Sequence, residues 1–151
     1  MEKLSKEKDF YAILSSLELI KLNLKNKNYT TVLELYKSLL SEKNLENYYK
    51  SAIATKAAYN FIEIQYNNLS KNYISDIKNL LSFIDDELDS YQGIKLELNF
   101  LLEVLEIEKN NLLYNNSQKV KNIHKQIMEN EKISSTIKER VNKIHEFHIY
   151  K

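Results

Sequence analysis

The chain has 151 residues with no Cys, no Pro and a single Gly, and its net charge is +1 at neutral pH. The lack of cysteine excludes disulfide frameworks, thiolate metal sites and cysteine nucleophiles, and the lack of helix breakers and turn formers indicates one all-α domain, residues 1–151. Charges interrupt the N-terminal residues and no stretch reaches the ~20 apolar residues of a membrane span, so we expect a cytoplasmic protein without a membrane partner.

Apolar residues at helical spacing predict seven helices joined by short polar connections. In chain order the helices cover residues 5–26, 30–42, 45–67, 73–88, 91–114, 117–130 and 135–148. Thr31 with Glu34 and Asp89 with Gln92 have the spacing of a capping box at a helix start. The acidic residues 85–87 have the composition of a paired-carboxylate site, but we interpret them as solvated turn residues.

One apolar pattern returns twice along the chain. A shift of 45 residues, followed by a shift of 43, carries the first set onto the second and the third. The three sets are Leu17, Leu24, Val32, Leu35 and Leu39; Ile62, Leu69, Ile77, Leu80 and Ile84; and Leu105, Leu112, Val120, Ile123 and Ile127. Such a period is typical of stacked antiparallel helical hairpins. The predicted repeat units are 5–43, 45–88 and 91–130, with 135–148 as a C-terminal capping helix.

The hairpin unit and its packing register resemble the tetratricopeptide repeat across nearly the whole chain. The period exceeds the usual 34 residues, the signature Trp, Gly and Pro are missing, and only the apolar positions correspond. Long degenerate repeats of this kind are similar to the C-terminal domains of Gram-positive peptide-sensing regulators of the Rgg, PlcR and Rap type. The resemblance implies a short superhelix whose concave face holds a signalling peptide, while a separate domain produces the output.

If the resemblance holds, the first helix of each unit lies on the concave face. The residues that it presents there form a stripe along the helix, next to the stripe that packs in the core. Glu recurs at three equivalent positions of that stripe, where carboxylates flanked by Tyr and Lys suit the amino terminus or a basic side chain of an extended peptide. A solvated helix face is the alternative interpretation. The predicted ligand-binding residues are Tyr11, Leu14, Glu18, Lys21, Lys56, Tyr59, Glu63, Tyr66, Asn99, Leu102, Glu106 and Lys109.

Asparagine also recurs, at Asn23, Asn68 and Asn111, near the end of each first helix. Amide side chains there can hydrogen-bond a ligand, but we favour bonds to the last carbonyls of their own helix.

Other classes of site find little support in the sequence. Residues 76–108 carry nine acids against two lysines, and residues 119–151 carry eight Lys and Arg against four acids. Because Arg140 is the sole arginine and no basic stripe dominates, we expect no direct contact with nucleic acid. His145 and His148 lie one helical turn apart without a third ligand nearby, and we expect them to pack between helices or to lie at the surface and not to bind metal. We expect His124, in the repeat position of Tyr36 and Leu81, to belong to the core. No nucleophile or phosphate-loop motif is present, so we expect no enzyme and no cofactor.

Two functional hypotheses follow. The first is the peptide- or protein-sensing part of a cytoplasmic bacterial regulator, which would respond through a change of superhelical curvature. The second is a constitutive scaffold, an antitoxin-like blocker or a homodimer. Its interface would be the apolar last helix, with Ile137, Val141, Ile144, Phe147 and Ile149.

Overall fold

The computed structural model describes residues 2–150, and it describes side chains from residue 10 to residue 150. Met1 and Lys151, the ends of the predicted domain, lie outside the described residues. Within 2–150 the chain forms seven α-helices and one 3₁₀ turn and no strand, which confirms the all-α prediction. The elements are α1 (Glu2–Lys25), α2 (Tyr29–Leu40), α3 (Asn47–Asn67), α4 (Ile74–Leu81), α5 (Asp89–Lys109), η1 (Tyr114–Asn116), α6 (Gln118–Glu129) and α7 (Ser135–Ile149).

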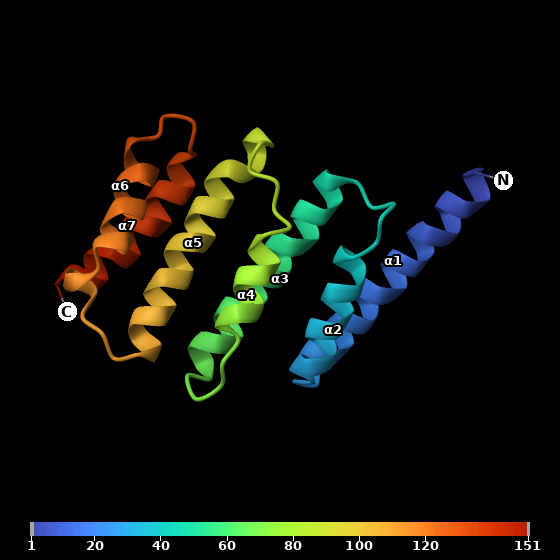
Figure 1. The fold of residues 1–151 in the computed structure, drawn as a ribbon, viewed down its shortest axis with the longest axis horizontal. Coiled ribbons are helices and arrows are strands. Elements are labelled where there is room, and N and C mark those ends of the chain that lie inside the picture. The colour runs from blue at the N-terminus through green and yellow to red at the C-terminus, as the bar shows by residue number, and fades with distance from the viewer. Residues whose placement is uncertain (1, 151) are drawn as a thin grey trace. The chain divides into compact units, whose positions relative to one another are not determined.

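The chain divides into two compact units, residues 1–46 and residues 47–151. Unit 1 is a helical hairpin of α1 and α2 (Figure 1). Its second helix buries Val32, Tyr36, Leu39 and Leu40. Their spacing places all four on one face of the helix, as the apolar periodicity predicts.

Unit 2 contains α3 to α7, and α5 is its central helix. The α3–α4 hairpin lies on one side of α5 and the α6–α7 pair on the other (Figure 1), and α5 contacts all four of these helices. A buried apolar cluster joins α5 to η1, α6 and α7 through Phe100, Val104, Ile107, Tyr114, Val120, Ile127, Ile133, Ile137 and Val141. Burial of these side chains supplies the main favourable term in the folding of this half.

The only glycine of the chain, Gly93 of α5, lies against the side chains of Ile137 of α7 and of Ile133 before it. A β-carbon at Gly93 would lie 3.3 Å from Cδ1 of Ile137 and 3.4 Å from the side chain of Ile133. Gly93 therefore serves close packing between the two helices, since its backbone is not at positive φ.

Two of the long helices end in the same way. At the end of α1, Asn28 N donates to Asn23 O at 2.8 Å, and Lys27 has φ 59°. At the end of α5, Leu112 N donates to Ile107 O at 2.9 Å, and Asn111 has φ 54°. Both are Schellman motifs, which satisfy the last helix carbonyls with one residue in the left-handed conformation. This turn ends the first and third predicted hairpin helices without a glycine.

The second long helix, α3, ends through a buried glutamine. Gln65 is fully buried, its Oε1 accepts from Tyr73 N at 2.6 Å, and its Nε2 donates to Lys71 O at 2.8 Å and to Asn68 O at 3.1 Å. One side chain thus satisfies three backbone groups of the α3–α4 turn. The side chain of Asn68 donates to Ile64 O at 2.9 Å, and that of Asn23 donates to Leu19 O at 2.8 Å, so both asparagines serve their own helices as predicted.

Several predicted helix ends are wrong. Helix α2 starts at Tyr29 and α5 at Asp89, with no side-chain cap at either N-cap, so the two capping boxes do not form. Side-chain caps are made instead by Ser117 at α6 and Ser134 at α7. Helix α4 ends at Leu81, before the acidic residues 85–87, which agrees with the unfavourable interaction of carboxylates with a helix C-terminus. The acidic residues thus lie in the turn before α5, as interpreted from the sequence.

Candidate functional site

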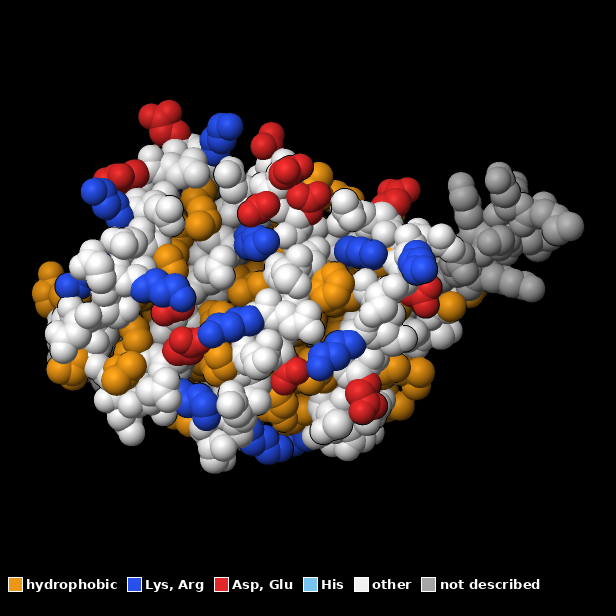
Figure 2. Space-filling view, viewed as in Figure 1, with side chains coloured by type: hydrophobic (Ala, Val, Ile, Leu, Met, Phe, Trp, Pro, Cys, Tyr) orange, Lys and Arg blue, Asp and Glu red, His pale blue; other side chains and the backbone are white. Residues whose placement is uncertain are grey.

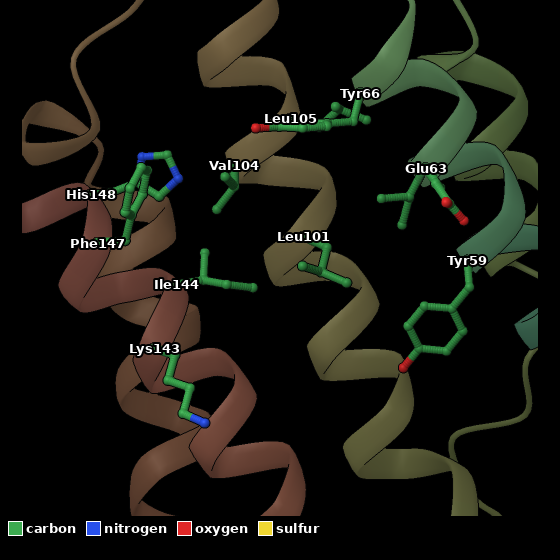
Figure 3. Close-up of a pocket in the computed structure, with 11 residues that line it drawn as sticks. Tyr59, Glu63, Tyr66, Leu101, Val104, Leu105, Lys143, Ile144, Phe147 and His148 are labelled. Atoms are coloured by element: carbon green, nitrogen blue, oxygen red, sulfur yellow. The ribbon is translucent and has the colours of Figure 1, made fainter. Parts of the chain in front are cut away.

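Unit 2 contains an apolar groove that we call the α5 groove. It has a volume of about 570 Å³ and runs between α3 and α7, with α5 as its floor (Figure 3). Three helices supply its lining, which consists of Tyr59, Ile62, Glu63, Tyr66, Leu101, Val104, Leu105, Lys143, Ile144, Phe147 and His148.

The α3 wall is an amphipathic stripe. Tyr59, Ile62, Glu63 and Tyr66 recur at spacings of three, one and three residues, which places them on one face of the helix. Tyr66 is 63% exposed, whereas Tyr59 is half-buried. The wall therefore offers aromatic surface at both ends with an acidic side chain between them.

The floor and the α7 wall are mostly apolar. Leu105 and Val104 on the floor are only 2% and 8% exposed, so they form a packed base and not a mobile one. On the α7 wall Phe147 is 64% exposed. Figure 3 shows Ile144 extending from α7 toward Leu101 of the floor. An exposed phenylalanine beside a packed apolar floor is the kind of surface that binds another apolar group.

A charged network fixes both walls to the floor at one end of the groove. Arg140 of α7 donates from Nε to Glu97 Oε1 at 3.1 Å and from an Nη atom to Oε2 at 2.7 Å. Glu97 on α5 is 3% exposed, so this bidentate pair compensates a buried charge. Burial raises the pKa of Tyr59 on α3 above its ordinary value, the negative charge of Glu97 raises that pKa further, and the positive charge of Arg140 opposes this in part. The network therefore ties α3, α5 and α7 together.

Two charges at the groove have no partner. Glu63 on α3 and Lys143 on α7 are both exposed, and neither forms an ion pair or hydrogen bond with any residue whose side chain the structure describes. They lie on opposite walls, as Figure 3 shows. The groove therefore presents one negative and one positive group on either side of an apolar floor.

Three predicted ligand-binding residues, Tyr59, Glu63 and Tyr66, meet in the α5 groove. Lys56 is exposed one turn before them and lies outside the lining. The four predicted residues of α1 are Tyr11, Leu14, Glu18 and Lys21. They are exposed along one face of α1, and none of them lines the α5 groove.

The four predicted residues of α5 do not line the groove. Leu102 is buried at 4% exposure, and Asn99 is half-buried. Glu106 pairs with Lys78 of α4 at 2.7 Å, and Lys109 donates to Leu69 O at 3.2 Å and Lys71 O at 3.1 Å in the α3–α4 turn. Glu106 and Lys109 therefore hold α5 against the α3–α4 hairpin.

The sequence reasoning missed the floor and the second wall. Leu105 had been assigned to the core by its repeat position, and Leu101 and Val104 had no assignment. Ile144 and Phe147 belong to the apolar interface that the sequence predicts on the last helix. That apolar character was the only sequence feature that pointed to the α7 wall. Ile62 and Leu105, equivalent in the predicted repeat, both face the groove.

The described part of the chain contains no group of three or more His, Asp or Glu side chains placed to hold a metal ion. His145 and His148 instead pack around Tyr114, whose hydroxyl lies 2.8 Å from His145 Nδ1 and whose ring stacks on His148 at 4.9 Å. None of the described helices has the length and apolarity needed to cross a membrane.

Comparison with known proteins adds no identity, because the chain matches no family model, no curated protein and no solved structure.

Proposed function

We propose that the chain is a non-enzymatic binding domain whose α5 groove captures a short segment of another polypeptide. The observation that carries this proposal is an apolar groove of about 570 Å³ flanked by two unpaired charges of opposite sign. Its volume falls in the range of roughly 300–1,000 Å³ that is typical of sites for small ligands. Its lining combines apolar and aromatic side chains with a few polar groups, as such sites do.

The size of the groove favours a short segment over a folded partner. Interfaces between folded proteins bury on the order of 800 Å² on each partner. A cavity of this volume holds only a few side chains, which one turn of helix or a short extended peptide supplies. Tyr66 and Phe147 provide rigid aromatic surface on the two walls at low cost in side-chain entropy.

The charges define the chemistry of the segment. A basic group of the ligand would lie at Glu63 on the α3 wall, and an acidic group would lie at Lys143 on the α7 wall. Between them the ligand would place apolar side chains against Leu101, Val104 and Leu105. Such exposed ion pairs contribute roughly 0.2–1 kcal/mol each, so apolar contact supplies most of the affinity and the charges supply orientation.

The biological setting rests on the resemblance to peptide-sensing regulators. We propose that the domain is the sensing part of such a regulator and acts through a partner, with no direct contact to nucleic acid. Figure 2 supports the last point, because acidic and basic side chains are interspersed over the visible face of unit 2 and neither sign dominates.

Direct binding measurements test the proposal. The probes are four short fluorescent peptides with one shared centre of Leu and Phe, which carry no charge, one Lys, one Glu or both. We expect the peptide with both charges to bind most tightly to the wild-type protein in fluorescence anisotropy. Tyr66→Ala should weaken binding of all four peptides by roughly tenfold or more, because it removes an aromatic anchor.

The charge variants separate the two walls. Glu63→Gln should remove the advantage of the Lys-bearing peptides, and Lys143→Gln that of the Glu-bearing peptides, by up to about fivefold each. Lys56→Gln is the matched control, since Lys56 is exposed on α3 outside the groove. If no peptide binds to the wild-type protein, the groove is not the ligand site. The same conclusion follows if Tyr66→Ala and Lys56→Gln both bind the peptides as tightly as the wild type does.

A second candidate occupant is another copy of the chain. Phe147 and Ile149 at the end of α7 are 64% and 37% exposed, and Tyr150 after it is 85% exposed. Ile137 and Val141 of the predicted interface are instead buried in the core of unit 2, so only the end of α7 is open to a second copy. Light scattering over a range of concentrations decides between the two. A dimer that Phe147→Ser dissociates would favour self-association, and a monomer at all concentrations would favour the peptide.

A further inference from the structure

All three histidines of the chain lie together beside the α7 wall. The ring of His145 on α7 stacks on that of His124 on α6, with centroids 3.7 Å apart and an interplanar angle of 17°. Tyr114 of η1 contacts both histidines of α7, because its hydroxyl lies 2.8 Å from His145 Nδ1 and its ring stacks on His148. We call these four residues the histidine cluster. It is where α6 and η1 hold the C-terminal half of α7.

Charged groups face the cluster from three helices. Lys121 of α6 and Glu146 of α7 act on His145 with opposite signs. On the α5 side, Glu108 Oε1 lies 3.5 Å from His148 Nδ1. Asn142 of α7 is the polar neighbour of His124, with Oδ1 3.3 Å from Nε2. His145 therefore meets one histidine ring and one lysine from α6 and a single carboxylate from its own helix.

This environment favours the uncharged form of His145. Burial lowers the pKa of His145 below its ordinary value of 6.5, the charges of His124 and Lys121 lower it further, and Glu146 opposes them in part. A conformation in which α7 has moved away from α6 takes up the proton at a higher pH than the packed conformation does. Packing is therefore fully favoured above pH 6.5 and is weakened as the pH falls below that value.

The same segment of α7 forms a wall of the α5 groove. Ile144 and Phe147, the residues on either side of the pair 145–146, line the groove, and His148 belongs both to the groove lining and to the cluster. Movement of α7 away from α6 and η1 must therefore move groove-lining side chains. Among the residues that line the groove, His148 is the one histidine.

We propose that the histidine cluster is an acid-sensitive contact that holds the α7 wall in place, so that the α5 groove loses its ligand in mildly acidic solution. The predicted loss of ligand rests on the proposed function. The predicted loosening of α7 does not rest on it and is measurable without any ligand.

The experiment compares the wild type with His145→Phe and His145→Gln near pH 7.5 and near pH 5.5. His145→Phe keeps an aromatic ring against His124 and cannot be charged, and His145→Gln is a second neutral variant in case the phenylalanine disturbs folding. Glu139→Gln is the control, because Glu139 is exposed on α7 and has no described contact with the cluster. Two readouts are taken: amide hydrogen exchange in α7, corrected for intrinsic rates, and affinity for the fluorescent peptide that carries both charges.

In the wild type and in Glu139→Gln we expect faster exchange in α7 and a loss of peptide affinity at the lower pH, because protonation of His145 disfavours the packed position of α7. In both His145 variants we expect exchange and affinity to change clearly less with pH than in the wild type, because the charge that forms on His145 is absent. Wild-type exchange and affinity that do not change with pH would overturn the inference, and peptide binding at both values would leave the proposed function intact. If no peptide binds at either pH, the proposed function fails, and the exchange data alone support or overturn the acid-sensitive contact.

Discussion

Helices α3 and α5 hold equivalent places in the predicted repeat, yet they use the same positions differently. On α3 the stripe beside the core stripe, with Tyr59, Glu63 and Tyr66, lines the α5 groove. On α5 the equivalent stripe, with Leu102 and Glu106, is buried or paired with α4. Of the α5 residues that line the groove, Leu105 belongs to the predicted apolar repeat, and its equivalent on α3, Ile62, lines the groove as well.

The number of neighbours explains the difference. Helix α5 contacts α3, α4, α6 and α7, so almost every stripe along it is covered. Within unit 2, α3 contacts only α4 and α5 extensively, which leaves the stripe with Tyr66 open. A repeat position therefore fixes the residue type but not its role, because the role depends on which helices surround it.

The largest effect is expected at the buried stripe. Leu102→Ala should lower the free energy of unfolding by roughly 2–5 kcal/mol, because it leaves a cavity in a packed site. Tyr66→Ala, on the exposed stripe of α3, should change it by less than about 0.5 kcal/mol. Urea denaturation followed by circular dichroism measures both. Equal losses would mean that α3 and α5 do not differ in their surroundings.

The next effect concerns the ion pair between α5 and α7. Arg140→Ala should cost roughly 3 kcal/mol, because Glu97 would remain buried without its partner. Glu97→Ala should cost less, since the Arg140 side chain is 51% exposed and water can hydrate it. Arg140→Lys should lie between the wild type and Arg140→Ala, because lysine keeps the charge and loses the bidentate geometry. A larger loss of unfolding free energy in Glu97→Ala than in Arg140→Ala, measured by urea denaturation, would contradict this explanation.

A smaller effect is expected at the end of α3. Gln65→Leu removes hydrogen bonds to three backbone groups of the α3–α4 turn and should cost roughly 1–3 kcal/mol. Hydrogen exchange should localise the loss to the amides of residues 68–73, including Tyr73 N. Asn72→Ala in the same turn is the control, because Asn72 is exposed and makes one hydrogen bond at 3.3 Å. A loss spread evenly over unit 2 would argue against a local role for Gln65.

The smallest effect concerns the left-handed residues. Lys27→Gly should stabilise the chain by about 1 kcal/mol and Asn111→Gly by less, because asparagine tolerates positive φ better than lysine does. Asn68→Gly, at the equivalent end of α3, should destabilise it, because Asn68 is not at positive φ and donates to Ile64 O. Thermal unfolding of the three variants gives the signs, and stabilisation by Asn68→Gly would contradict the assigned difference between the helix ends.

The periodicity of apolar residues was sufficient to predict seven helices, because each helix buries one face at helical spacing. Helix ends were less predictable. The turn after α5 depends on Asn111 in a conformation that composition does not reveal. The segment after α4 makes a three-dimensional contact with α3, in which Asp85 N donates to Ser51 Oγ at 2.9 Å.

For the site, the α3 wall was predictable as a stripe of one helix. The floor was not, because the face that α5 turns to the groove is set by the packing of four other helices around it. The proposed stacking of all repeats into one superhelix stays a prediction, as does the single-domain organisation.

The bond between Glu97 and Arg140 spans 43 residues of sequence, and this has a consequence for biosynthesis. While α5 is being translated, the guanidinium that will neutralise its buried carboxylate does not yet exist. A nascent chain that has reached α6 therefore lacks a low-energy way to bury that face of α5. We expect ribosome-bound intermediates of this length to stay sensitive to protease until α7 has been synthesised.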